Sequence, residues 1–187
     1  YRADILGISE GQYDIKVISV KDNIEVGSFS EASINVMSHD RSGFSFLGES
    51  TGAYKLDGTL KENAQVIYVT KHNAKTVTAN VNGEIQTGLQ TILDAKQKRD
   101  TSNDVLCIRI IGTISLSDLD HISSSSEGLQ VKGRSEYTNM NITIEGVGND
   151  AYFNGFGMLI RNCSNVEVRN LGFINFMDDG ISIDTDN

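Results

Sequence analysis

The sequence contains no proline and only two cysteines, Cys107 and Cys163. The absence of proline argues against stiff proline-rich linkers. The two cysteines do not form a C-x-x-C pair, so neither a zinc knuckle nor a redox motif is predicted. Both lie in or beside apolar runs, which favours packing as small apolar residues in a core and leaves a disulfide as the alternative.

Long apolar runs are also missing, because no stretch approaches the roughly 20 residues that a membrane-spanning helix needs. No signal peptide is visible. Positive charge is scarce, with 16 Lys and Arg against 25 Asp and Glu and a net charge of −9. Such a chain repels nucleic acids and anionic membranes, so neither is expected as a partner. An acidic polymer can still bind where a cation lies between the two surfaces.

Glycine, by contrast, is abundant, and the 18 glycines among alternating apolar runs predict a β-rich protein with tight turns. The first forty residues alternate in a way that predicts about three strands, too few to bury a core alone. Within them, "ISEGQYDIKVISV" resembles the tyrosine corner of fibronectin type III modules, with Gly11 in the turn and Tyr13 tying a strand to the chain upstream. Residues 1–38 are therefore interpreted as part of such a β-sandwich module.

Residues 39–65 are rich in Gly, Ser and charge and predict a linker or a wrapping loop, with the linker placed at 39–59. Beyond it we expect a strand at 66–70 and a helix at 88–99, in which Leu89, Ile92 and Leu93 share one face. A strongly apolar strand is expected at 105–114, and the polar stretch 115–139 predicts an insertion-like loop.

The last third of the chain repeats itself. "NITIEGVG" begins at Asn141 and "NVEVRNLG" at Asn165, 24 residues later, while "GMLIRN" begins at Gly157 and "GISIDT" at Gly180, 23 residues later. A repeat of this length indicates a solenoid of stacked units, here with two short strands in each unit. We predict an all-β fold, an incomplete right-handed parallel β-helix over 60–187, with the helix at 88–99 as its N-terminal cap.

Stacking of the units predicts which side chains point into the core and which point outward. Inward positions should be apolar, with Ile142 and Ile144 stacking near Val166 and Val168. Leu159 should lie in register with Ser182 or close to it. Other positions should point outward, to solvent or a groove: Thr143, Glu145, Glu167 and Arg169.

The run "NITIEGVGNDAYFNGFGMLIRNCSNVEVRNLGFINFMDDGISIDTDN" resembles polysaccharide lyase family 1, the pectate lyases, and "VIYVT", "CIRIIGTI" and "ITIEGVG" occur in the order of that family's first strand and first two coils. The resemblance implies a secreted, calcium-dependent enzyme that cleaves polygalacturonate by β-elimination. It also implies that the catalytic arginine lies in later coils. The chain is therefore interpreted as an N-terminal part, whose partners are acidic polysaccharide and either C-terminal coils or another copy.

The same resemblance places a Ca²⁺ site on the acidic cluster near the end of the chain. Asp179, together with Asp178, matches the start of the family's acidic strand, and calcium favours several carboxylate oxygens. Many relatives have two acids separated by one residue there, whereas this chain has Met177 at the earlier position. Asp184 and Asp186 are interpreted as turn residues. No catalytic residue is assigned, and Arg161 and Arg169 are interpreted as surface residues.

Two other functions fit the same sequence. Galacturonan hydrolases are also β-helices, and "DDGISI" would then provide an acid–base pair. A non-catalytic β-helix used for carbohydrate binding or assembly is the third reading, since an open final coil offers strand edges to a partner.

Overall fold

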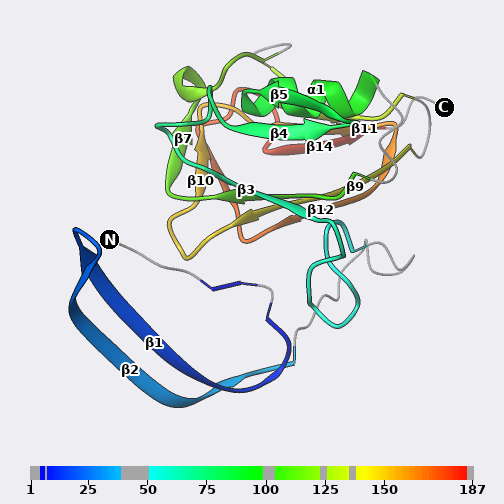
Figure 1. Cartoon of the computed structure of the whole chain (residues 1–187). Coiled ribbons are helices and arrows are strands. Elements are labelled where there is room, and N and C mark those ends of the chain that lie inside the picture. Colours follow the sequence, from blue (N-terminus) through cyan, green and yellow to red (C-terminus); the bar gives the residue numbers. More distant parts are fainter. Residues whose placement is uncertain are drawn as a thin grey trace.

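The computed structural model describes residues 5–6, 8–38, 51–98, 104–122, 126–134 and 138–184. Strands dominate these residues, which contain one α-helix, α1 (Leu89–Lys98) (Figure 1). The all-β class expected from the sequence is confirmed by this dominance of strands, most of which pair in parallel. No helix in the described part is long and apolar enough to cross a membrane.

The N-terminal residues form a long antiparallel hairpin of β1 (Gly11–Lys21) and β2 (Ile24–Val36). The two-residue turn between them, Asp22 and Asn23, has the left-handed backbone that such hairpins favour. The Tyr13 hydroxyl donates to the Ser9 carbonyl at 2.9 Å, which confirms the predicted tie to the chain upstream. The described N-terminal part has two strands where the sequence predicts about three, because Ile5 and Leu6 form none.

Three parallel sheets make up the main body, with strand orders β12-β9-β6-β3, β13-β10-β7 and β14-β11-β8. From β6 onward, successive strands enter the three sheets in strict rotation. The bounds are β3 (Gln65–Val69), β6 (Leu106–Ile110), β7 (Thr113–Ser115), β8 (Leu129–Lys132), β9 (Thr138–Gly146), β10 (Tyr152–Asn154), β11 (Met158–Arg161), β12 (Cys163–Arg169), β13 (Gly172–Ile174) and β14 (Ile181–Asp184).

The register between neighbouring units is the one expected from the repeat. The structure pairs Ile142 with Val166, Ile144 with Val168, and Leu159 with Ser182. Apolar side chains from all three sheets meet in one core, and several are fully buried there: Ile108, Ile114, Leu129, Ile144 and Phe153. The core explains the spacing of the sequence repeat, because each unit must place its apolar side chains over those of the unit before it.

Three sequence predictions about the strands are wrong in detail. Each unit carries three strands instead of two, because β10 and β13 are only three residues long and show no clear alternation. Residues 105–114 are not one strand, since the chain turns at Gly112 (φ +68°) from β6 into β7 of another sheet. The stretch 115–139 is not only a loop, because it contains β8, in which Leu129 and Val131 are fully buried.

Helix α1 packs against β8, the outermost strand of its sheet in the described part. The Gln90 side-chain amide pairs with the backbone of Gln130: it accepts from the Gln130 N–H at 2.9 Å and donates to the Gln130 carbonyl at 3.1 Å. The Gln90 side chain thus bonds to the backbone groups of β8 that a further strand would otherwise use. The helix therefore has the position expected of a cap.

The start of α1 is held by the loop that follows β7. Asp120 accepts hydrogen bonds from the backbone N–H groups of Gln90 and Thr91, at 2.9 and 3.0 Å. These amides have no partner within the helix, so the carboxylate acts as an N-cap from outside the helix. His121 lies between two carboxylates, 2.9 Å from Asp94 on α1 and 3.1 Å from Asp120. A hairpin of β4 (Thr78–Val81) and β5 (Glu84–Thr87) flanks the helix.

Candidate functional site

The two acids predicted to bind metal lie on the turn between β13 and β14. Asp178 and Asp179 are both exposed, and the Asp179 carboxylate accepts a hydrogen bond from the Ser182 hydroxyl at 2.8 Å. The turn leads into β14, which is the outermost strand of sheet β14-β11-β8 in the described part. The two carboxylates are therefore accessible, and they lie just before a strand whose pairing holds the following residues in place.

Asp184 does not belong to this turn. It is the last residue of β14, in register with Arg161 of β11, and its carboxylate accepts from the Arg161 guanidinium through Nε at 2.9 Å and through Nη2. The prediction that Asp184 is a turn residue is therefore wrong, and Arg161 is held by an ion pair between two units. Asp186 lies outside the described residues.

The path of the acidic turn depends on close backbone contact with the preceding unit. Gly157, just before β11, lies against the Asp179 carbonyl, and a Cβ at Gly157 would come within 1.9 Å of that oxygen. One unit earlier, a Cβ at Gly128 would come within 2.2 Å of the Gly157 carbonyl. Glycine is required at both positions because the backbones approach too closely for any side chain.

Replacing Gly157 with alanine is expected to displace the Asp179 backbone and lower the free energy of unfolding by about 1–3 kcal/mol, the usual cost of overpacking. Urea denaturation measures this loss. Gly180→Ala is the matched control, since a Cβ there meets its nearest neighbour, a Phe176 ring carbon, at an ordinary 3.4 Å. Equal stability of the two variants would contradict this prediction, because it would mean that the turn shifts away from Gly157 at no cost.

The residues on this turn have the chemistry of part of a calcium site. Carboxylate and hydroxyl oxygens are the hard ligands that calcium prefers, and it takes six to eight of them. Asp178, Asp179 and Ser182 offer oxygens within one short segment. Within the described ranges, no group of three or more His, Cys, Asp or Glu side chains is arranged to hold a metal ion. Asp178 and Asp179 therefore fit a calcium site as contributors to it.

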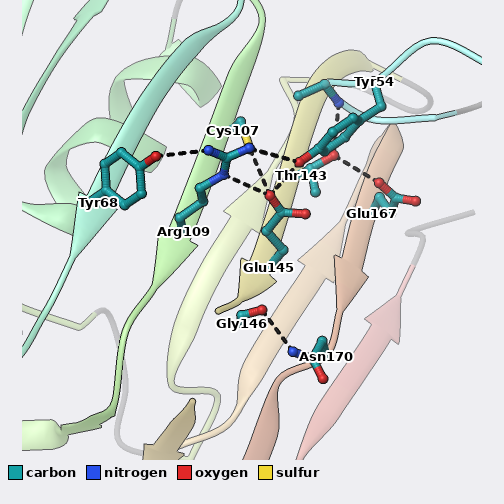
Figure 2. Close-up of polar contacts among 10 residues, drawn as sticks. Tyr54, Tyr68, Cys107, Arg109, Thr143, Glu145, Gly146, Glu167 and Asn170 are labelled. Carbon is teal, nitrogen blue, oxygen red and sulfur yellow. Dashed lines mark hydrogen bonds and ion pairs between the residues drawn. The ribbon is translucent and has the colours of Figure 1, made fainter. Parts of the chain in front are cut away.

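A second polar arrangement lies on the outer face of sheet β12-β9-β6-β3, beneath residues 51–61, which we call the strap (Figure 2). The sequence predicts that outward side chains on this face meet solvent or a groove. That prediction is wrong for Thr143 and Glu167, which are 0% and 7% exposed because the strap and Arg169 cover them. Of the alternatives for residues 39–65, a wrapping loop describes the strap.

Backbone groups of the strap bond directly to side chains on the sheet. The Gly52 N–H donates to the Asn165 side chain at 2.8 Å, and the Ala53 N–H donates to the Thr143 hydroxyl at 2.9 Å. The Lys61 ammonium closes the strap by donating to the Gly52 carbonyl at 2.7 Å and to the Asn141 side chain at 3.0 Å. The strap is therefore anchored to β9 and β12 at several points.

An ion pair lies at the centre of this interface. Arg109 on β6 donates from Nε to Glu145 on β9 at 3.0 Å, and the two side chains are 5% and 12% exposed. The remaining guanidinium nitrogens donate to the hydroxyls of Tyr68 and Tyr54, at 2.9 and 3.3 Å. Tyr54, from the strap, donates in turn to Glu145 (Figure 2). Strap and sheet thus share one hydrogen-bonded network.

The protonation states of this network suit a structural role. Burial raises the pKa of the Cys107 thiol to about 12, and the nearby Glu145 carboxylate adds to the effect. Burial and the bond to Glu145 also hold the pKa of Tyr54 above its usual range. Desolvation opposes the charge on Arg109, but its bonds to Tyr54, Glu145 and Tyr68 raise its pKa overall. The thiol and the phenol therefore stay protonated, so neither Cys107 nor Tyr54 is poised as a nucleophile.

Sequence reasoning missed this network, although one signal for it exists. Arg109 interrupts the apolar run "LCIRII", and Glu145 comes directly after the stretch "NITI". The two are direct register partners on β6 and β9. Opposite charges at paired positions of adjacent strands predict an ion pair. Comparison of the chain with protein-family models, with curated proteins and with solved structures finds no match.

Proposed function

We propose that residues 60–187 are the N-terminal coils of a right-handed parallel β-helix from a secreted, calcium-dependent pectate lyase. Support for the fold comes from three parallel sheets entered in rotation, with the repeat in register. The observation that carries the function is the pair of exposed carboxylates, Asp178 and Asp179, on the turn into β14. The tie between Tyr13 and Ser9 supports a partial fibronectin type III-like module before the coils.

In this proposal the chain contributes ligands and their positioning. Calcium, when bound, neutralises the carboxylate of the substrate and makes the adjacent carbon more acidic. Asp179 and Asp178 would hold the ion, the Ser182 hydroxyl orients the Asp179 carboxylate, and Gly157 sets the course of the turn. Arg161 is engaged by Asp184, so we assign it no catalytic role. The base is proposed to come from later coils of the protein.

The open edge of the stack supports a strand-bearing partner. β12, β13 and β14 are the outermost strands of their sheets in the described part. Apolar side chains are exposed on or beside them, among them Phe176, Met177, Ile181 and Ile183. Unpaired edges with apolar neighbours favour the addition of further strands. We therefore propose that this edge pairs with later coils of the protein or with another copy.

The Asp179→Asn variant is expected to bind calcium at least about tenfold more weakly than the unchanged chain, because it loses one charged ligand. Isothermal titration with calcium measures the affinity. Asp22→Asn is the matched control: it removes the same charge from the β1–β2 turn, where asparagine is also favoured, and should leave the affinity unchanged. Unaltered binding in Asp179→Asn would exclude Asp179 as a ligand.

Activity is tested separately, with polygalacturonate as substrate, on a form of the protein that includes the proposed later coils and their base. Elimination forms an unsaturated product that absorbs ultraviolet light, and its formation should need calcium. Saturated products would instead identify a hydrolase, in which a general acid and base flank the bond. Binding without either product would indicate a carbohydrate-binding or assembly role.

A further inference from the structure

An open groove lies at the other end of the unit series, where the β3–β4 connection meets the turn between β6 and β7. Its volume is about 560 Å³, within the range of small-molecule sites. The polar side chains that line it are Thr70, Lys71, His72, Thr113, Ser115 and Asp118. The groove is formed beside the first strands of the stack, and it is therefore separate from the turn with Asp178 and Asp179, which follows β13.

One wall carries two basic side chains on a rigid turn. Asn73 fixes this turn, because its side chain accepts from the Thr70 N–H at 2.7 Å and donates to the Tyr68 carbonyl at 2.9 Å. Lys71 and His72 are exposed at its tip, and their side chains make no hydrogen bond or ion pair with other described residues. The wall is therefore preorganised, with its basic groups available to a ligand.

A second wall, formed by β7 and the turn after it, is acidic and hydroxylated. Asp118 lies in a short 3₁₀ turn (Leu116–Asp118) and accepts from the Ser115 N–H at 2.8 Å through one carboxylate oxygen. Its other oxygen accepts no hydrogen bond from the rest of the described chain. Thr113 is exposed beside it at the start of β7. The Asp118 carboxylate can therefore accept hydrogen bonds from ligand hydroxyls, and the Thr113 hydroxyl can both donate to them and accept from them.

The two walls together select a ligand that carries both a carboxylate and hydroxyl groups. An inorganic anion would use the basic wall and be repelled by Asp118, whereas a neutral sugar would leave Lys71 and His72 without a partner. A uronate satisfies both, with its carboxylate on the basic wall and its ring hydroxyls on Asp118 and Thr113. We infer that this groove binds a uronic acid unit without calcium. The inference rests on the groove alone and extends the proposed function.

The test uses the whole chain, with calcium removed by a chelator, and D-galacturonate and D-galactose as probes. Galacturonate should bind at least about tenfold more tightly than galactose, in titrations followed by NMR. The double variant Lys71→Gln/His72→Gln should reduce galacturonate affinity at least about tenfold, because it removes the basic groups that would bind the carboxylate. It should fold normally, since both side chains are exposed and make no contacts that the fold needs. Lys75→Gln is the control, an exposed lysine of the same connection that does not line the groove.

Three results would overturn the inference: no galacturonate binding, equal binding of galactose, or an equal loss in Lys75→Gln and the double variant. Failure here is separable from failure of the proposed function. Asp179→Asn should bind galacturonate normally in chelator while losing calcium affinity. The double variant should bind calcium normally while losing galacturonate.

Discussion

Glu145→Gln is expected to lower the free energy of unfolding by about 3–5 kcal/mol, the usual cost of removing one member of a buried ion pair. The substitution keeps the shape of the side chain and removes its charge. Arg109 would remain charged and almost fully buried, 5% exposed, with two tyrosine hydroxyls as its neighbours. Those hydroxyls cannot replace the carboxylate as a counter-ion. Urea denaturation of both proteins measures the difference.

The same variant should loosen the strap, because Glu145 accepts the hydrogen bond from Tyr54. Trypsin should then cleave after Lys55, within the strap, faster than in the unchanged chain. Glu62→Gln is the control: Glu62 pairs with Lys55 at 3.9 Å on the surface, and its loss should cost less than about 1 kcal/mol. If both variants lost the same stability, the buried pair would contribute no more than a surface pair.

A double replacement of Arg109 and Glu145 by Met and Leu separates the cost of an unpaired buried charge from the contribution of the ion pair itself. Buried ion pairs are often exchanged for apolar residues at little cost, whereas a single unpaired charge is expensive. The double variant should therefore be more stable than Glu145→Gln. A double variant that is less stable would mean that the pair itself, together with the tyrosine hydroxyls, contributes most of the stabilisation.

The parts of the fold that sequence reasoning predicted are those with a clear period. The recurrence of Ile142 and Ile144 as Val166 and Val168 predicted both the stacking and its register, because a parallel pair keeps equivalent residues side by side. β10 and β13 were missed because three residues cannot display an alternation. β8 was missed for a similar reason, since its four residues lie in a polar stretch.

The prediction for the outer face of the four-stranded sheet failed for a different reason. Alternation tells which side chains point away from the core, but it does not tell what covers them. Thr143 and Glu167 do point outward, and the strap then buries them. Only the register match of Arg109 with Glu145 hinted that this face would exclude water. The position of Asp178 and Asp179 was expected from the family resemblance, at the start of a strand, and the structure places both on the exposed turn just before β14.

Side-chain amides complete hydrogen bonding around the stack at several places. Gln90 pairs with the backbone of Gln130, and Gln65 does the same with Asn80, accepting from its N–H at 2.8 Å and donating to its carbonyl at 2.7 Å. Asn170 donates to the Gly146 carbonyl at 2.9 Å (Figure 2). These contacts satisfy backbone groups at strand edges and turns without another strand. At the other end of the series, β12, β13 and β14 have no further strand beside them in the described part.

The second large effect is expected from Lys96, a fully buried lysine on α1 whose ammonium donates to the Asp104 carbonyl at 2.7 Å. Burial lowers its pKa from 10.5 to about 8, against a smaller opposing effect of the Asp104 charge. Between these two values the unfolded chain holds a proton that the folded chain has released. Stability from this residue therefore rises with pH across the window, by about 3 kcal/mol in total.

Lys96→Met keeps the length of the side chain and removes the titrating group. As pH rises from about 7 to about 10.5, the free energy of unfolding of the unchanged chain should increase by about 3 kcal/mol relative to this variant. Other groups that titrate in the range, such as Cys107, are present in both proteins, so their contributions cancel. Urea denaturation at the two pH values measures the difference. Lys98→Met, at an exposed position of the same helix, should show no such gain, and an equal gain there would refute the assignment to Lys96.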